Sequence, residues 1–120
     1  IRDPAPLLAA GIAYIDLLAS CAIVIAKPGY GTFVEAIANR TRLVHVERPG
    51  WSETPALAGW VRRHGCAVEI AKATPPEEAA RMIRALMAET PPAPPALTGA
   101  DDAADVLLGF ARAAANRYRG

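Results

Sequence analysis

The chain has 120 residues, of which 52% are hydrophobic and 21% are charged, and its formal net charge is +1. This length fits one domain with an ordinary hydrophobic core. The balance of apolar and charged residues excludes a disordered chain and argues against a nucleic-acid-binding surface. The longest apolar stretch, residues 4–25, is broken by Gly11 and Asp16, so it does not predict a transmembrane helix.

Short β-branched runs alternate along the chain with helical patterns, which predicts parallel β-α units. The expected fold is therefore α/β, a Rossmann-like parallel sheet layered with helices. Residues 11–16 are a candidate for a short first strand, and residues 17–20 for a turn or short helix. The continuous apolar run at residues 22–26 predicts a strand buried on both faces.

A glycine-bearing loop and a helix follow that strand. Thr32 is the expected N-cap, and the buried stripe is expected at Phe33, Val34, Ile37 and Ala38. Residues 43–46 then form the next predicted strand.

A second helix is expected to begin with Thr54 as N-cap and Pro55 at its first position. Its expected core residues are Leu57, Trp60 and Val61. It is expected to end at Gly65, acting as a left-handed C-cap. The third predicted strand covers residues 67–70.

The third helix is predicted to open with a capping box at residues 74–77. Its expected buried residues are Ala79, Met82, Ile83 and Leu86. The proline-rich residues 91–98 predict an extended spacer. It leads to a last helix at 100–116, with Leu107 and Phe110 on one apolar side. We expect the spacer to carry this helix away to pack elsewhere, against a second copy or another lobe.

Residues 27–35, with the sequence KPGYGTFVE, carry the clearest chemical signal. A strand leads into a loop with Gly29 and Gly31 and then into a helix, so this loop is predicted at the carboxyl edge of the sheet, where α/β proteins bind ligands. Glycines let the backbone approach a ligand, and the N–H groups at a helix start favour an anion such as a diphosphate. Lys27 adds a positive charge, and the Thr32 hydroxyl can donate a hydrogen bond.

Glu35, one turn further on, could accept hydrogen bonds from two adjacent ribose hydroxyls. A purely structural interpretation is also open: Thr32 and Glu35 fit a capping box, the glycines fit ordinary turns, and Lys27 fits a solvated strand end. Under the ligand-binding interpretation, we expect five residues to border one cleft at the carboxyl edge of the sheet: Lys27, Gly29, Gly31, Thr32 and Glu35.

Residues 13–65 resemble the C-terminal lobe of glycosyltransferase family 28 and related GT-B enzymes. The resemblance rests on Gly29 followed six residues later by Glu35, within the wording KPGYGT-x-x-E-A. It implies that Lys27, Gly31 and Thr32 lie at the diphosphate and that Glu35 binds the ribose. It also implies that Glu53 meets hexose hydroxyls, although capping of the next helix explains Glu53 equally well.

By this resemblance, residues 1–120 form the nucleotide-sugar-binding lobe of a hexosyl- or N-acetylhexosaminyltransferase, with one or two further strands expected upstream. The donor is expected to be a UDP-sugar, and neither a metal nor another cofactor is expected, because cationic and amide groups stabilise the departing diphosphate. The acceptor and the catalytic base would belong to a missing N-terminal lobe or a partner chain, so the chain alone is expected to be inactive.

Two positions depart from the family pattern. Ala22 stands where relatives carry an aspartate before the strand, and Arg40-Thr41-Arg42 replaces a G-x-P sequence. These departures leave open a non-catalytic subunit that senses or binds nucleotide sugars. A homodimer, or contact of Arg62, Arg63 and the basic residues of 112–119 with an anionic lipid surface, also stays open.

The remaining polar residues give weaker signals. Cys21 and Cys66 lack metal-ligand spacing and favour reduced, buried thiols in a cytoplasmic protein. His45 and His64 are expected to be neutral, packed or surface residues. Trp51 is a loop aromatic that could stack on a base or a sugar.

Overall fold

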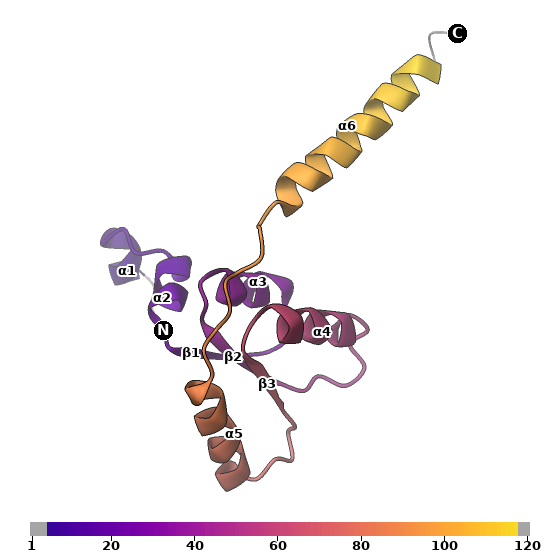
Figure 1. Ribbon diagram of the computed structural model, residues 1–120. Coiled ribbons are helices and arrows are strands. Elements are labelled where there is room, and N and C mark those ends of the chain that lie inside the picture. Colours follow the sequence, from indigo (N-terminus) through magenta and orange to yellow (C-terminus); the bar gives the residue numbers. More distant parts are fainter. Residues whose placement is uncertain (1–4, 118–120) are drawn as a thin grey trace.

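The computed structural model describes residues 5–117 and contains a three-stranded parallel sheet with helices on both of its faces (Figure 1). The strands are β1 (Ile23–Ala26), β2 (Arg42–Val46) and β3 (Ala67–Ile70), in the order β1-β2-β3. Ala26 pairs with His45, and His45 pairs with Glu69. The predicted α/β fold, with a parallel sheet layered with helices, is confirmed.

Six helices are present in the described part of the chain. They are α1 (Ala5–Ala9), α2 (Tyr14–Ser20), α3 (Tyr30–Ala38), α4 (Thr54–His64), α5 (Pro76–Ala88) and α6 (Gly99–Arg117). Figure 1 shows α3 and α4 on one face of the sheet and α5 on the other. Helices on both faces are typical of parallel strands, since the crossover from each strand to the next must cover a face.

Two apolar clusters form the core, one on each face of the sheet. The larger one joins α2, α3 and α4 to β2 and is centred on Phe33, Ile37 and Leu43. The smaller one contains Val44 and Leu86 and lies between the sheet and α5. Adjacent residues of β2 thus enter opposite clusters, as the two-residue period of a strand dictates.

The first predicted strand, at residues 11–16, is wrong. Residues 11–13 have no regular structure and α2 already begins at Tyr14. The Asp16 carboxylate accepts a hydrogen bond from the Ala13 N–H at 2.8 Å. This bond satisfies a free donor at the helix start and favours helix over strand.

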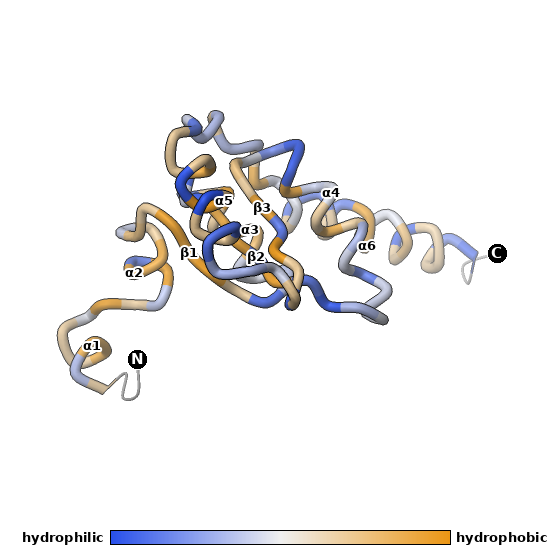
Figure 2. Tube along the Cα trace, turned by 90° about the horizontal axis from the view of Figure 1, so that it is seen from below, coloured by the Kyte–Doolittle hydropathy of each residue, from blue (hydrophilic) through white to orange (hydrophobic). Residues whose placement is uncertain are grey.

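The expectation that the strand at 22–26 is buried on both faces is also wrong. Figure 2 shows β1 as a strongly apolar segment, yet Ile25 is 64% exposed. β1 is an edge strand of the described sheet, and α5 packs over β2 and β3 instead. An apolar run therefore marked a strand correctly but not its position in the sheet.

The expected helix caps differ from the observed ones. Gly29 is the N-cap of α3 and Glu53 the N-cap of α4, so Thr32 and Thr54 lie inside their helices. At the N-termini of α3 and α4, no side chain makes a capping hydrogen bond. The capping box predicted at residues 74–77 is absent as well, and Pro75 is the N-cap of α5. The N-cap residues Gly29, Glu53 and Pro75 therefore start their helices without a side-chain cap.

Gly65 ends α4 in an extended conformation, with φ −157° and ψ −175°, so the predicted left-handed cap is wrong. Steric crowding explains why a glycine stands at this position, since a Cβ here would overlap Cδ1 of Ile37. Among the predicted core residues, Val34 is 37% exposed and Trp60 is only partly buried. In the expected stripe of α5, Leu86 alone is fully buried.

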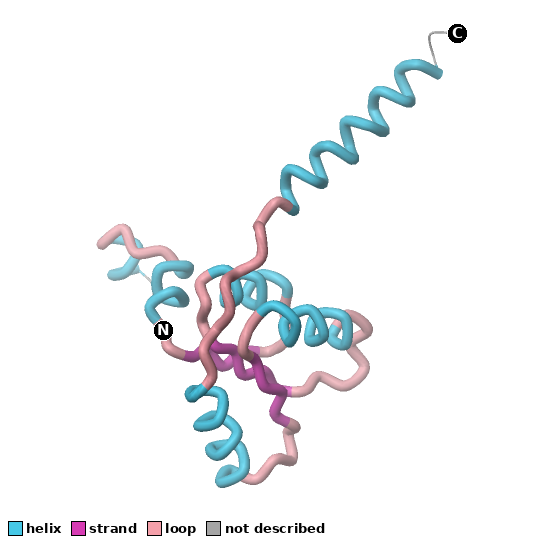
Figure 3. Tube along the Cα trace, viewed as in Figure 1, coloured by secondary structure: helices cyan, strands magenta, loops and turns pink. Residues whose placement is uncertain are grey.

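Two arginines bind the chain where it leaves α5 and enters the spacer that leads to α6. Residues 89–98 have no regular structure (Figure 3). The guanidinium of Arg42 donates to the Glu89 carbonyl at 2.6 and 3.1 Å, and Arg40 donates to the Pro91 carbonyl at 2.8 Å. Beyond this anchor α6 projects away from the sheet (Figure 1), and none of its described residues is buried. It is one residue longer at each end than the predicted range 100–116.

Candidate functional site

The loop between β1 and α3 lies at the carboxyl edge of the sheet. β1 ends at Ala26, Lys27 follows with an exposed side chain, and α3 begins at Tyr30. The first backbone hydrogen bond of the helix runs from the Phe33 N–H to the Gly29 carbonyl, at 3.1 Å. The N–H groups of Tyr30, Gly31 and Thr32 therefore have no partner within the helix. They form an arc of donors at the positive end of the helix dipole.

The six residues singled out from the sequence lie on two neighbouring loop–helix junctions. Lys27, Gly29, Gly31, Thr32 and Glu35 belong to the β1–α3 junction, and Glu53 belongs to the β2–α4 junction. Lys27, Gly31 and Glu53 are exposed, whereas Gly29, Thr32 and Glu35 are half-buried. Because β1 and β2 are parallel neighbours, both junctions share one edge of the sheet.

The capping-box interpretation of Glu35 is wrong. Thr32 is the third residue of α3, so Glu35 lies in the second turn, too far along the helix to cap its first N–H groups. Its backbone carbonyl accepts a hydrogen bond from Asn39 Nδ2 at 2.8 Å. Among the described residues, its carboxylate has neither a hydrogen-bond nor an ion-pair partner. The side chain is thus not used by the local fold.

Neither loop glycine is needed for the backbone conformation. Gly29 has φ −169°, an extended value that any residue adopts. A Cβ on Gly31 would meet nothing within 4 Å, and one on Gly29 would meet only the Lys27 carbonyl oxygen, at 4.0 Å. The chain itself therefore gives no packing reason for these glycines, and the space in front of the α3 N-terminus is open.

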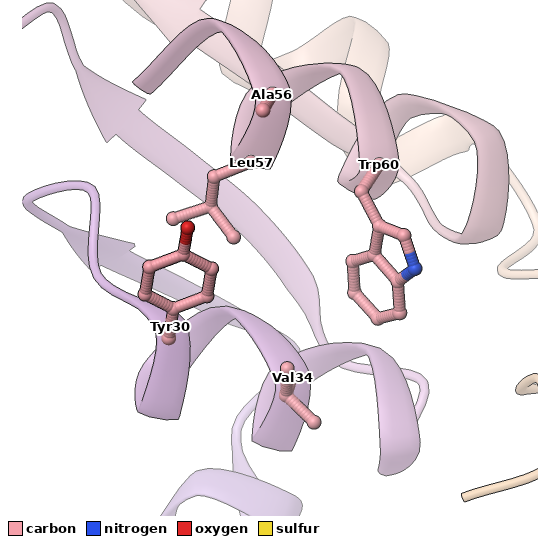
Figure 4. A pocket seen from close by; sticks show the side chains of 5 residues that line it. All are labelled: Tyr30, Val34, Ala56, Leu57 and Trp60. Atoms are coloured by element: carbon pink, nitrogen blue, oxygen red, sulfur yellow. The ribbon is translucent and has the colours of Figure 1, made fainter. Parts of the chain in front are cut away.

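Two pockets lie near this edge. An apolar groove of about 350 Å³ runs between α3 and α4 and is lined by Tyr30, Val34, Ala56, Leu57 and Trp60. Figure 4 shows these side chains facing one another across the two helices. None of the six sequence-predicted residues lines it, although Tyr30 and Val34 alternate with them on α3.

The second pocket, of about 240 Å³, lies between the β2–α4 loop and β3. Its walls include Arg48, Trp51, Thr54 and Glu69, and again none of the six predicted residues. The Arg48 guanidinium stacks over the Trp51 ring at 3.5 Å, a cation–π contact that holds the loop aromatic in place. Sequence reasoning noted Trp51 but missed its pairing with Arg48, three residues earlier.

His45 lies inside the sheet beneath this pocket. It is 1% exposed, and neither ring nitrogen has a hydrogen-bond partner among the described residues. Burial lowers its pKa, Glu69 at 3.9 Å opposes that shift, and Arg62 adds to it. The ring also packs against Phe33 with centroids 5.2 Å apart. His45 is therefore a neutral core residue, in line with its sequence interpretation.

Cys66 matches the prediction of a buried thiol, whereas Cys21 does not. Cys66 is buried and Cys21 is exposed, and both are free thiols. Burial raises the pKa of Cys66, as do a hydrogen bond to and the charge of Glu89. Within residues 5–117, no group of three or more His, Cys, Asp and Glu side chains is arranged to hold a metal ion.

Comparison with known proteins gives no match to a family model, a curated protein or a solved structure. No helix in the described range 5–117 is both long and apolar enough to cross a bilayer. Arg119, the last basic residue considered for lipid contact, lies outside the described part of the chain.

Proposed function

We propose that the chain binds a nucleotide sugar, with UDP-sugars as the first class to test, as the donor-binding lobe of a GT-B-type glycosyltransferase that transfers a hexosyl or N-acetylhexosaminyl group. The start of α3 carries the proposal. Three backbone N–H groups without a partner in the helix stand at its positive end, behind an exposed Lys27 and open space. A diphosphate is the anion that such a donor arc and a lysine would hold together.

Glu35 supports the nucleoside part of the proposal. Its carboxylate is half-buried, lies one turn behind the donor arc and is unused by the fold. A carboxylate in such a position can accept hydrogen bonds from both hydroxyls of a ribose whose diphosphate sits at the helix start. Glu53, exposed at the neighbouring junction, is the residue proposed for the hexose hydroxyls.

Transfer itself requires groups that this lobe is not expected to supply. Under the proposal, the acceptor and the catalytic base come from another lobe or a partner chain, and the same donor site would serve a subunit without catalysis. The primary measurement is therefore binding. Calorimetric titration with UDP, UDP-GlcNAc, GDP and CDP is expected to give saturable binding of the uridine compounds, without added metal. Absence of binding by all four compounds would refute the proposal.

Glu35→Gln tests the ribose contact. The loss of charge-assisted hydrogen bonds to two hydroxyls is expected to weaken nucleotide binding by roughly ten- to a hundredfold. Removal of the ligand's 2′-hydroxyl should weaken binding to the native chain but much less to the variant. Glu78→Gln, an exposed change on α5, serves as the control. An equal loss from deoxyribose in native and variant chains would show that Glu35 does not contact that hydroxyl.

Gly31→Ala separates ligand approach from folding. The added methyl group meets no atom of the chain, so the fold should tolerate it and gain up to about 1 kcal/mol from the better helix former. Nucleotide affinity should fall, because the methyl group projects where the diphosphate is proposed to lie. Gly59→Ala, in the middle of α4, is the matched control and should leave affinity unchanged. Unchanged affinity of Gly31→Ala would remove the diphosphate from the start of α3.

A further inference from the structure

The described part of the chain contains both an unfilled apolar groove and an uncovered apolar helix. The groove between α3 and α4 holds about 350 Å³ and is walled by Tyr30, Val34, Leu57 and Trp60 together with Ala56. Tyr30 is 55% exposed and Val34 is 37% exposed, so the groove opens to solvent. Grooves between two helices are a common seat for the apolar side of a third helix.

α6 carries such an apolar side. At helical spacing, Ala103, Val106, Leu107, Phe110 and Ala114 fall on one stripe. Val106 is 58%, Leu107 68% and Phe110 70% exposed, although a stripe of this size in a stable protein is normally covered. The stripe from 103 to 114 is about 16 Å long, which matches the length of the eleven-residue α4.

Charged residues at the ends of α4 and α6 favour one relative orientation of the two helices. α6 has Asp101 and Asp102 in its first turn and Arg117 in its last. α4 has Arg62 and Arg63 in its last turn and Glu53 at its N-cap. All of these side chains are exposed. If α6 lies antiparallel to α4, its Asp101 and Asp102 meet Arg62 and Arg63 at the end of α4, and the helix dipoles also oppose.

We propose that α6 of one molecule docks antiparallel to α4 in the α3–α4 groove of a second copy, and that the exchange is reciprocal. The spacer argues for a second copy rather than the same molecule. Hydrogen bonds from Arg42 and Arg40 hold the carbonyls of residues 89 and 91. Prolines 92, 94 and 95 stiffen the segment that follows, and α6 stands away from α3 and α4 of its own chain (Figure 1). Reciprocal exchange of a helix gives a closed two-fold dimer with two equivalent seats.

The test uses Phe110→Asp, with Leu108→Asp as the matched control. Leu108 is 50% exposed and lies on the opposite side of α6 from Phe110. Analytical ultracentrifugation should show a dimer for the native chain and for Leu108→Asp. Phe110→Asp should raise the dissociation constant at least a hundredfold, about 2.8 kcal/mol. Far-UV circular dichroism should be unchanged, because the Phe110 side chain is 70% exposed within one copy.

The fluorescence of Trp60, which lines the groove, tests whether α6 binds there. In a Trp51→Phe background it is the single tryptophan, and its emission should shift to shorter wavelength as the dimer forms. Reversing Arg62 and Arg63 to aspartate should weaken the dimer, and reversing Asp101 and Asp102 to arginine in the same chain should restore it. A native chain that is monomeric at all concentrations would overturn the proposal. So would a monomer whose Trp60 emission responds to Phe110→Asp, since α6 would then occupy its own groove.

Discussion

Replacing Gly65 with alanine is expected to destabilise the fold through a collision with one side chain. The extended backbone of Gly65 is open to any residue, so backbone strain contributes nothing. The new Cβ would overlap Cδ1 of Ile37 and lie 3.3 Å from its Cγ1. Ile37 is 2% exposed and packs in the larger core cluster, so it has little room to turn away.

The magnitude results from two opposing effects. Forcing an extra carbon into a packed core costs about 1–3 kcal/mol. Alanine also restricts the unfolded chain more than glycine does, which returns about 0.4–1 kcal/mol. Urea denaturation of Gly65→Ala should therefore show a loss of roughly 1–2 kcal/mol in the free energy of unfolding, with an unchanged m-value.

A double-mutant cycle identifies the cause. Ile37→Val removes Cδ1, the atom that the new Cβ would overlap, and alone should cost about 0.5–1.5 kcal/mol. In the double variant the collision is relieved, so the combined loss should be smaller than the sum of the single losses by at least about 0.5 kcal/mol. Strict additivity would refute the steric explanation, because a backbone effect at Gly65 is indifferent to the side chain at 37.

Three further outcomes are expected from the fold. Because burial lowers the pKa of His45, the unfolded chain binds a proton at this residue more readily than the folded chain does. Stability should therefore fall as the pH drops below about 6.5, by up to about 1.4 kcal/mol per pH unit, and His45→Leu should flatten that slope in thermal melts. Thr41 donates to the Leu18 carbonyl at 3.1 Å inside the core, and that carbonyl also accepts from the Cys21 N–H, so Thr41→Val should cost about 0.5–1.5 kcal/mol in urea denaturation. Arg40 has φ +58°, so Arg40→Gly should be more stable than Arg40→Ala by about 1 kcal/mol, the reverse of the usual order in a helix.

Periodicity located the regular elements well, because it reports on local geometry. The β-branched run at 67–70 became β3 with the predicted bounds, and the helices at 76–88 and 99–117 lie close to their expected ranges. Periodicity does not show which elements pack against one another in the fold. Ile25 is as apolar as a central-strand residue, and only the strand order shows that it lies on an edge strand.

The site could be predicted as a set of neighbours but not as a shape. Strand–loop–helix order was enough to bring Lys27 and Glu53 to one edge of the sheet. The cap at Gly29 rather than Thr32 was not predictable from preference rules, since those rules favour a side-chain cap that this helix start does not use. The apolar groove depends on which side chains meet across α3 and α4, and no local pattern contains that information.

The two arginines of Arg40-Thr41-Arg42 have a structural role in this fold. Arg40 takes the left-handed conformation that a glycine would take more easily, at a cost of about 1–2 kcal/mol. In return its guanidinium, with that of Arg42, donates to the carbonyls at the start of the spacer. A glycine and a proline at these positions could make neither contact. Arg40 and Arg42 therefore link the turn after α3 to the spacer that precedes α6, and they affect the placement of that helix.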